Sequence, residues 1–335
     1  MRRVTLRDVA ALARVSSSTV SRALNDHPAI TPTTKEAVRS ACEKLGYVPD
    51  LAAKSLAGHG TQTIGIIIPD ISNPYFSALC TAAESYAAEQ GYRVILANTL
   101  HDPDYELEAV NQMLAQQVEG LLISACSPTS QSQHIRMTGT LPCVYLGSNH
   151  GPHCSFVEAD NARGAFEAAQ YLALLGHRRI VFFGGRQGSR TLDQRLTGYR
   201  RSMALNGLAP REIILRQKGG KLREWCRQQA LSLFRSGDVP DAFLVYSDAL
   251  ATRVLDAAER CGLHVPEDFS IIGFDNILFS QMPQVGLTSV SQQKKCAGRL
   301  AAQRLFEKIG GAQGDSADIL PTELIIRTSC RKFKR

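Results

Sequence analysis

The sequence predicts an α/β protein with a small all-helical N-terminal head, a hinge helix and a core of two doubly wound parallel-sheet lobes. Three observations predict this fold class. A chain of 335 residues has room for two or three domains. Apolar residues over 1–48 recur only at helical spacing. From residue 61 onward, short β-branched runs alternate with helical stretches.

The head contains three predicted helices. A capping box of Thr5 and Asp8 begins the first, at about 6–13, and a short connection leads to the second, at 17–24. A third lies between a threonine cap and a glycine stop over 31–46. The outer face of the second helix carries small polar groups and one arginine, which is typical of a helix-turn-helix that enters the DNA major groove. A three-helix protein-binding module with a solvated second helix fits the same pattern.

The rest of the chain predicts βαβ units around parallel sheets. Two similar lobes are expected, with a ligand site outside the carboxyl ends of the strands and between the lobes. Strands are expected near 64–68, 93–97, 120–124 and 142–146, and in a second set near 179–183, 212–216, 242–246 and 270–274, followed by the short segments 287–290 and 324–326. Helices are expected near 75–90, 104–117, 130–138, 162–175, 192–206, 222–236, 249–261 and 292–309.

Charge is unevenly distributed along the chain. The formal net charge is +7, residues 1–60 hold nine basic and five acidic residues, and four of the last five residues are basic. Such clusters are typical of phosphate binding, although a solvated basic surface has the same composition.

The composition also favours a cytoplasmic protein. No apolar run approaches the roughly 18 residues of a membrane span, and no apolar stretch of a signal peptide follows Met1. The nine cysteines are scattered and never spaced C-x-x-C. This pattern predicts small, buried, reduced thiols, with no disulfide framework and no metal site.

An enzyme is the alternative class, and the sequence argues against it. It contains no P-loop, nucleophile-elbow or zinc-protease motif, and Gly184–Gly188 has the wrong spacing for a nucleotide signature. His101, His134 and His177 are interpreted as surface or turn residues rather than as catalytic groups. We therefore expect no enzymatic activity and no cofactor.

Several segments share a dense and specific pattern. They are Thr5–Ala10, Val15–Asn25, Leu45–Pro49, Ile64–Pro69, Asn73–Phe76, Gly176–Ile180, Arg195–Tyr199 and Ile272–Asp275. On these segments the chain resembles the lactose-repressor (LacI/GalR) family of bacterial transcription regulators, and the resemblance covers essentially the whole chain. It implies a helix-turn-helix domain at 1–48, a hinge helix and linker at 49–60, and a periplasmic-binding-protein-like core at 61–335. The two core lobes are then about 61–158 plus 292–320, and 159–286 plus 322–330.

The resemblance assigns DNA contacts residue by residue. It implies base contacts for Ser17, Ser18 and Arg22. It implies backbone contacts for Thr5, Ser16, Thr19, Ser21, Asn25 and Tyr47. In the hinge it places Lys54 and Leu56 in the minor groove, where an apolar wedge kinks the duplex. A plain flexible linker is the alternative, because so short a helix is marginal in water.

The resemblance also implies an effector site between the lobes. Its residues are Tyr75, Phe76, Asp160, Thr191, Arg195, Ser247 and Asp275. Carboxylates and an arginine around an aromatic face suit a sugar or sugar derivative, because each hydroxyl can donate and accept. Basic residues near the cleft favour a sugar acid or phosphosugar instead: Arg186, Arg190 and Lys218. The alternative for Arg195 and Asp275 is a structural salt bridge across the cleft.

These features predict a sequence-specific DNA-binding transcriptional regulator, a repressor whose operator affinity responds to the effector. A palindromic operator needs two heads, so a homodimer is expected. No leucine heptad follows the last predicted strand, which favours a dimer over a tetramer. Two alternatives remain: a periplasmic-type solute-binding protein, for which residues 1–60 have no use, and a sugar-modifying enzyme with an appended head. We expect no membrane partner.

Overall fold

The chain divides into two compact units in a computed structural model that describes residues 4–47, 60–127, 130–148, 150–216 and 221–333. The first unit is Met1–Thr61 and the second is Gln62–Arg335. Each unit is considered by itself below.

The first unit is a three-helix head. Its helices are α1 (Leu6–Ala13), α2 (Ser17–Leu24) and α3 (Pro32–Leu45), as the sequence predicts. One fully buried valine from each helix, Val9, Val20 and Val38, meets the others in a small core. The Asp8 carboxylate accepts hydrogen bonds from the backbone N–H and hydroxyl of Thr5, which fixes the start of α1.

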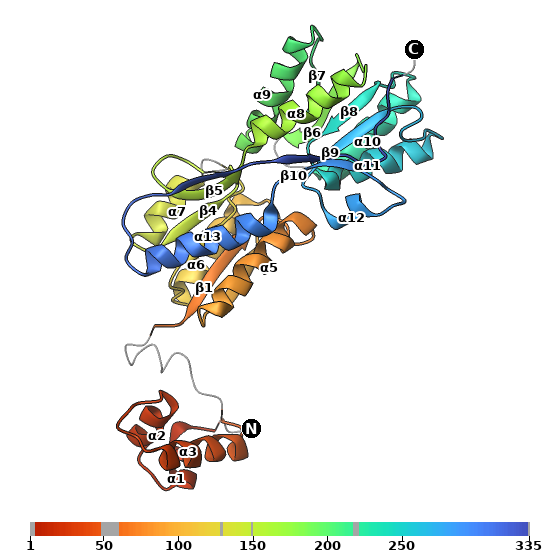
Figure 1. Ribbon diagram of the computed structural model, residues 1–335. Coiled ribbons are helices and arrows are strands. Elements are labelled where there is room, and N and C mark those ends of the chain that lie inside the picture. The colour runs from red at the N-terminus through yellow and green to blue at the C-terminus, as the bar shows by residue number, and fades with distance from the viewer. Residues whose placement is uncertain (1–3, 48–59, 128–129, 149, 217–220, 334–335) are drawn as a thin grey trace. The chain divides into compact units, whose positions relative to one another are not determined.

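The second unit contains two six-stranded sheets, one in each lobe (Figure 1). The first sheet has the order β11-β5-β4-β3-β1-β2 and is parallel throughout. The second has the order β12-β10-β9-β8-β6-β7, and only the β10–β12 pair is antiparallel. In both sheets the strand order reverses beside the first strand of the lobe, which is the position where doubly wound sheets bind ligands.

The first lobe is built from the following elements. Its strands are β1 (Thr63–Ile68), β2 (Arg93–Asn98), β3 (Leu121–Ile123), β4 (Cys143–Leu146), β5 (Ser155–Ala159) and β11 (Ala317–Leu320). Its helices are α5 (Pro74–Glu89), α6 (Pro103–Ala115), α7 (Gln131–Thr138) and α13 (Lys294–Ile309).

The second lobe repeats this plan. Its strands are β6 (Ile180–Arg186), β7 (Arg211–Leu215), β8 (Ala242–Val245), β9 (Ser270–Phe274), β10 (Thr288–Ser291) and β12 (Glu323–Ile325). Its helices are α8 (Asn161–Leu174), α9 (Arg190–Leu205), α10 (Leu222–Arg235), α11 (Asp248–Arg260) and the short α12 (Leu278–Gln281).

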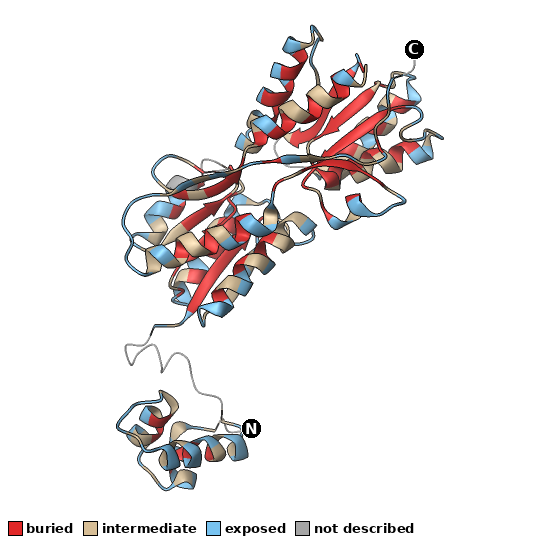
Figure 2. Cartoon of the chain, viewed as in Figure 1, coloured by how far each residue is buried: buried red, intermediate tan, exposed pale blue. Residues whose placement is uncertain are grey.

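Most predicted elements are confirmed within one or two residues, but the sequence interpretation missed β5, β11 and α12. The strands β5 and β11 pair with each other at one side of the first sheet. Only three of the five β5 side chains are apolar, and β11 alternates exposed and half-buried residues, so neither gives the continuous apolar run of a central strand. Central strands such as β1, β8 and β9 are buried along their whole length (Figure 2).

Three chain crossovers connect the lobes: from β5 to α8, from β10 to α13, and from β11 to β12. The dark-blue segment in Figure 1 shows the last of them passing directly from one sheet to the other. In the second lobe, α8 and α9 pack very closely. A Cβ on Gly198 would lie 1.9 Å from the Ala162 carbonyl oxygen, so only glycine permits this approach. This packing holds α9, which carries the candidate site residues Thr191 and Arg195, against α8.

All nine cysteines are free. The expectation that they are buried is confirmed only for Cys80 and Cys226. Six others are half-buried, and Cys296 is exposed in the first turn of α13. Among the described residues, no helix is both long and apolar enough to cross a membrane.

Candidate functional site

The candidate DNA-reading residues lie on α2 and at its ends. Ser16 caps the helix, and its hydroxyl accepts a hydrogen bond from the Thr19 N–H at 3.1 Å. The Ser16 hydroxyl also lies 2.7 Å from the Ser18 hydroxyl. Ser18 and Arg22 are exposed on the face of α2 away from the buried Val20, whereas Ser17, three residues before Val20, is half-buried at the side of that face.

The candidate phosphate-contacting residues surround this face. Asn25 ends α2, with its N–H bonded to the Ser21 carbonyl at 3.1 Å. Tyr47 packs against the head core, and its N–H donates to the Cys42 carbonyl at 2.9 Å. Thr5 is exposed at the start of α1. The hinge residues Lys54 and Leu56 lie outside the described residues.

Arg195 is the centre of the candidate effector site. It extends from α9, is only 3% exposed, and lies over two aromatic rings, with its guanidinium carbon 3.6 Å from the Phe274 centroid and 4.8 Å from that of Tyr246. Its Nε donates to Asn161 Oδ1 at 2.9 Å, and its Nη1 donates to the Tyr246 carbonyl. Stacking and hydrogen bonds together hold the guanidinium in one orientation.

Asp275 lies next to Arg195, and their closest charged atoms are 3.9 Å apart. Both residues belong to the second lobe, so the prediction that a salt bridge between them would cross the cleft is wrong. Asp275 follows β9 with a φ of 113°, a conformation that non-glycine residues rarely adopt and that concentrates at functional sites. Its carboxylate accepts from the Gln292 amide. Burial raises the pKa of Asp275 to about 7, against the opposing charge of Arg195.

A second buried carboxylate supports this edge of the sheet. Asp248, at the start of α11, accepts from the Ser289 hydroxyl at 2.7 Å and from the Ile277 N–H at 2.9 Å. Burial raises the pKa of Asp248 to about 6, although these hydrogen bonds lower it. Because Ile277 N–H and Ser289 flank the β9 and β10 ends, Asp248 fixes the loop that carries Asp275.

Tyr75 and Phe76 start α5 of the first lobe. Their rings meet edge to face, with centroids 5.1 Å apart, and both pack on the first-lobe core. Burial raises the pKa of Tyr75 above its ordinary value, and the charge of Asp275 raises it further while Arg195 lowers it. Tyr75 is therefore within electrostatic reach of the two central second-lobe residues, although it comes from the other lobe.

The remaining candidates occupy helix starts around this centre. Asp160 caps α8 and accepts from the Arg163 N–H at 3.0 Å. Thr191 is half-buried in the first turn of α9. Ser247 is 7% exposed and occupies the N-cap position of α11, where its side chain forms no capping hydrogen bond. Asp160 follows β5 of the first sheet, whereas Thr191 and Ser247 come after β6 and β8 of the second, and no direct bond from them to Arg195 is found among the described contacts.

Basic residues near the cleft have specific partners. Arg190 donates to the His150 carbonyl at 3.1 Å, and the charge of Arg186 lowers the pKa of His101, where burial is the larger cause. Lys218 lies outside the described residues. Arg223, which the sequence interpretation did not select, forms a 2.7 Å ion pair with Asp70, so it joins α10 of the second lobe to the loop after β1.

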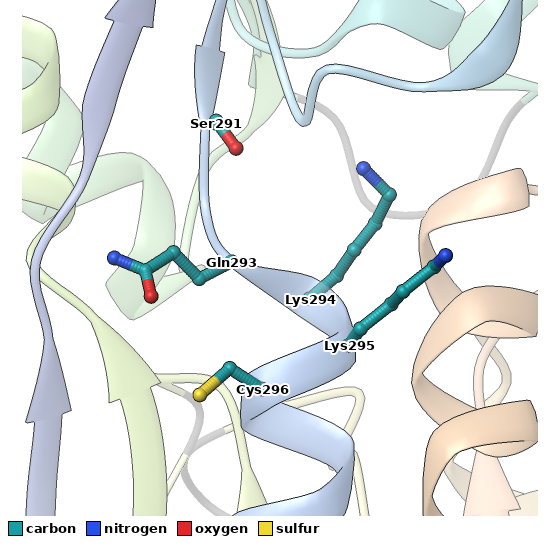
Figure 3. A pocket seen from close by; sticks show the side chains of 5 residues that line it. All are labelled: Ser291, Gln293, Lys294, Lys295 and Cys296. Atoms are coloured by element: carbon teal, nitrogen blue, oxygen red, sulfur yellow. The ribbon is translucent and has the colours of Figure 1, made fainter.

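A pocket of about 310 Å³ lies at the start of α13 (Figure 3). Its lining residues are Ser291, Gln293, Lys294, Lys295 and Cys296. In Figure 3 the two lysine side chains extend to one side of the helix start, and those of Gln293 and Cys296 to the other. Lys294 Nζ donates to the carbonyls of Asp275 and Asn276, at 3.0 and 2.7 Å. None of the candidate effector residues lines this pocket, but Lys294 connects it to their centre.

The sequence interpretation missed Asn161, Tyr246, Gln292 and Lys294. Asn161, Tyr246 and Gln292 follow strand ends within one or two residues, and position at the carboxyl end of a parallel strand is the signal that could have found them, whereas Lys294 begins α13.

The interpretation of His134 and His177 as surface or turn residues is wrong. His134 is fully buried, with Nε2 3.2 Å from a Glu106 oxygen, and His177 is 2% exposed and bonds to the Arg331 carbonyl. Both lie away from Arg195 in sequence and bind groups within their own lobe.

A helical head with a polar recognition face, joined to two ligand-binding lobes, defines a class of allosteric DNA-binding regulators. Residues 5–50 match the family described as bacterial regulatory proteins, lacI family, and residues 169–330 match the periplasmic binding protein-like domain. The HTH-type transcriptional repressor CytR of Escherichia coli (strain K12) is 33% identical, with 98% of this chain and 96% of that protein covered. The chain belongs to the lacI family of bacterial regulatory proteins.

Two solved structures extend the comparison. The lac repressor dimer bound to operator and the anti-inducer ONPF gives a TM-score of 0.84 at 27% identity, covering 98% of this chain and 99% of that one. The complex of the transcriptional regulator CelR with cellobiose gives 0.71 at 28% identity, covering 98% and 100%. The protein is therefore a DNA-binding transcriptional regulator, and the predicted fold class is confirmed.

Proposed function

We propose that the protein is a homodimeric repressor that binds a palindromic operator and responds to a sugar or sugar derivative held between its lobes. The observation that carries this proposal is the arrangement of Arg195. Its guanidinium is buried on aromatic faces beside Asp275, and Tyr75 of the other lobe is within electrostatic reach. A polyhydroxylated ligand there would satisfy charged donors and acceptors from both lobes at once.

The effector site in this proposal comprises the seven residues selected from the sequence. Arg195 and Asp275 would bind hydroxyl groups, and Tyr75 and Phe76 would cover an apolar ring face. Asp160, Thr191 and Ser247 would complete the polar rim. Two similar proteins support this chemistry, since a cellobiose complex and an ONPF complex are among the solved structures described above.

A sugar acid or phosphosugar is the second candidate. Lys294 Nζ and the Arg195 guanidinium both lie beside Asp275, whose pKa of about 7 leaves it only partly charged at neutral pH. Lys294 bonds to the backbone carbonyl of Asp275 and Arg195 lies against its carboxyl, and two cations beside this partly charged group favour an anionic ligand. Calorimetric titration with matched neutral and acidic sugars separates the candidates, because binding of neutral sugars alone would eliminate the anionic one.

The DNA-binding part of the proposal uses Ser17, Ser18 and Arg22 for bases and the surrounding residues for phosphates. Arg22 is exposed on α2 and can form a bidentate contact with guanine. Lys54 and Leu56 would bind the minor groove as part of a hinge at 49–60, between a domain at 1–48 and the core at 61–335. For Leu56→Ala we expect a larger loss of specific than of nonspecific affinity. Such a repressor would act in the cytoplasm, where its operator is.

The test begins with the full chain. A duplex is selected from a random-sequence library by the purified protein, and a thermal-shift screen identifies a sugar that raises the melting temperature. A mobility-shift assay then measures affinity for the selected duplex with and without that sugar. Deletion of residues 1–60 should abolish duplex binding and retain sugar binding. No preference for any sequence, with or without sugars, would overturn the proposal.

A further inference from the structure

Gln194 connects the two lobes through its side-chain amide. It lies on α9 of the second lobe, directly before Arg195. The hydroxyl of Ser148, which follows β4 of the first lobe, donates to Gln194 Oε1 at 2.7 Å. Gln194 Nε2 donates in turn to Glu158, a buried residue of β5, at 3.4 Å. One side chain of the second lobe therefore binds two side chains of the first.

The same amide is joined to Arg195 through one intermediate residue. Gln194 Oε1 also accepts from Asn161 Nδ2 at 3.0 Å. Asn161 Oδ1 then accepts from Arg195 Nε at 2.9 Å. A contiguous line of hydrogen bonds thus runs from the first lobe to the buried guanidinium of the candidate effector site.

The direction of every bond in this line is fixed. A guanidinium only donates, so Asn161 must present its oxygen to Arg195 and its amide nitrogen to Gln194. An ionised carboxylate only accepts, so Gln194 must present its nitrogen to Glu158 and its oxygen to Asn161. One amide orientation alone satisfies all the partners, and turning the Gln194 amide over would oppose donor to donor and acceptor to acceptor.

Glu158 is held as the charged end of this line. Its oxygen lies 3.5 Å from His150 Nε2, and both side chains are almost completely buried, at 6% and 3% exposure. The imidazole stacks on Phe156 with centroids 3.8 Å apart, and its Nδ1 faces the Gly151 carbonyl at 3.1 Å. Burial opposes the charge of Glu158, but the contact with His150 keeps its pKa below the ordinary value.

We propose that Gln194 is a positioning residue for the effector response, which ties the orientation of Arg195 to the position of the first lobe. The inference rests on the proposed effector site. Movement of Ser148 and Glu158 with the first lobe would pull on the Gln194 amide, and Asn161 would pass this change to Arg195. Because a half-satisfied buried polar network is costly, the line favours two discrete states over a gradual change.

The experiment uses three variants of the full-length protein. Gln194→Glu places a second carboxylate against Glu158 and leaves the Ser148 and Asn161 contacts possible. The double variant Gln194→Glu/Glu158→Gln reverses the pair, so that every donor again meets an acceptor. Gln170→Glu is the matched control, because the Gln170 amide oxygen accepts from Ser202 and Asn206 inside the second lobe.

Two measurements follow for each variant. The first is amide hydrogen exchange over 146–160 and 188–196, which we expect to be faster in Gln194→Glu and restored in the double variant. The second is affinity for the duplex that the wild type selects from a random library. We expect a change of about fivefold or more in Gln194→Glu, the lower end of typical allosteric coupling, and recovery in the double variant. The control should match the wild type over those segments and in affinity.

The outcomes separate this inference from the proposed function. Wild-type exchange and wild-type duplex affinity in Gln194→Glu would overturn the inference, and so would a double variant that recovers neither. If Gln194→Glu does not fold, Gln194→Met removes the same bonds without adding a charge. The inference then requires faster amide exchange and a changed duplex affinity in Gln194→Met. A wild type that selects no duplex contradicts the proposed function instead, and the exchange measurement still decides whether Gln194 couples the lobes.

Discussion

The guanidinium carbon of Arg195 lies 3.6 Å from the centre of the Phe274 ring. Phe274 is the residue directly before Asp275, whose backbone has a φ of 113°. The arginine is thus held by β9 while it extends from α9. Hydrogen bonds through Asn161 and Gln194 also connect this side chain to Glu158 of the first lobe.

Replacement of Arg195 is expected to separate the two functions of the protein. Arg195→Ala should abolish the response to the identified sugar, because the variant loses both the charge and the stacked donor, and duplex binding without sugar should remain. Arg200→Ala is the control, since Arg200 lies on the same helix but pairs with Glu212 at the surface. Mobility-shift titrations with sugar measure both, and an unchanged response in Arg195→Ala would remove it from the site.

The stability of the core is expected to depend on pH through Asp275. Its pKa of about 7 in the folded protein exceeds the ordinary value of 3.8, so between these values the folded state binds more protons than the unfolded state. Its contribution to stability is therefore lost as pH rises from about 4 to 7, and the loss is complete above pH 7. Asp275→Asn removes this dependence.

Urea unfolding at a series of pH values checks this prediction. Relative to the wild type, Asp275→Asn should gain free energy of unfolding from pH 4 to 7, by an amount on the order of 2–4 kcal/mol, and the difference should then stay constant. Asp248 contributes a similar but smaller dependence because its pKa is about 6. A difference that does not vary with pH would show that Asp275 titrates normally.

The close packing of α8 and α9 is expected to be sensitive to a single methyl group. Gly198→Ala would place a Cβ 1.9 Å from the Ala162 carbonyl, so the helices must separate. We expect a loss of roughly 1–3 kcal/mol or more in the free energy of unfolding, as overpacked sites show. In the control Gly310→Ala, at a φ of −73°, the nearest atoms are carbonyl oxygens 3.4 Å away, so little change is expected.

Arg22 is expected to provide sequence specificity. Arg22→Ala should lose about 1–3 kcal/mol of affinity for the selected duplex, with a smaller loss on random duplex, because a base contact discriminates and a phosphate contact does not. Arg39→Ala serves as the comparison, since Arg39 is exposed on α3 and lies 4.0 Å from Glu36. Equal losses on both duplexes would make Arg22 a phosphate contact.

Much of this protein is determined by its sequence alone. Apolar spacing and caps determine the helices of the head, and buried β-branched runs determine the central strands, because these signals depend on neighbours a few residues apart. The resemblance to the lactose-repressor family rests on contiguous segments, and it selected Arg195 and Asp275, which the fold brings to within 3.9 Å.

The tertiary structure alone decided how those residues are held. Hydrogen bonds to partners distant in the chain hold Asn161, Gln194, Glu158 and Lys294. The partner of each buried polar side chain is the donor or acceptor that the fold places opposite it, which the local sequence does not specify. Strands β5 and β11 were likewise settled by pairing with each other rather than by their own composition. Apolar spacing and caps therefore determine helices and strands, whereas polar networks depend on contacts that exist only once the two sheets have formed.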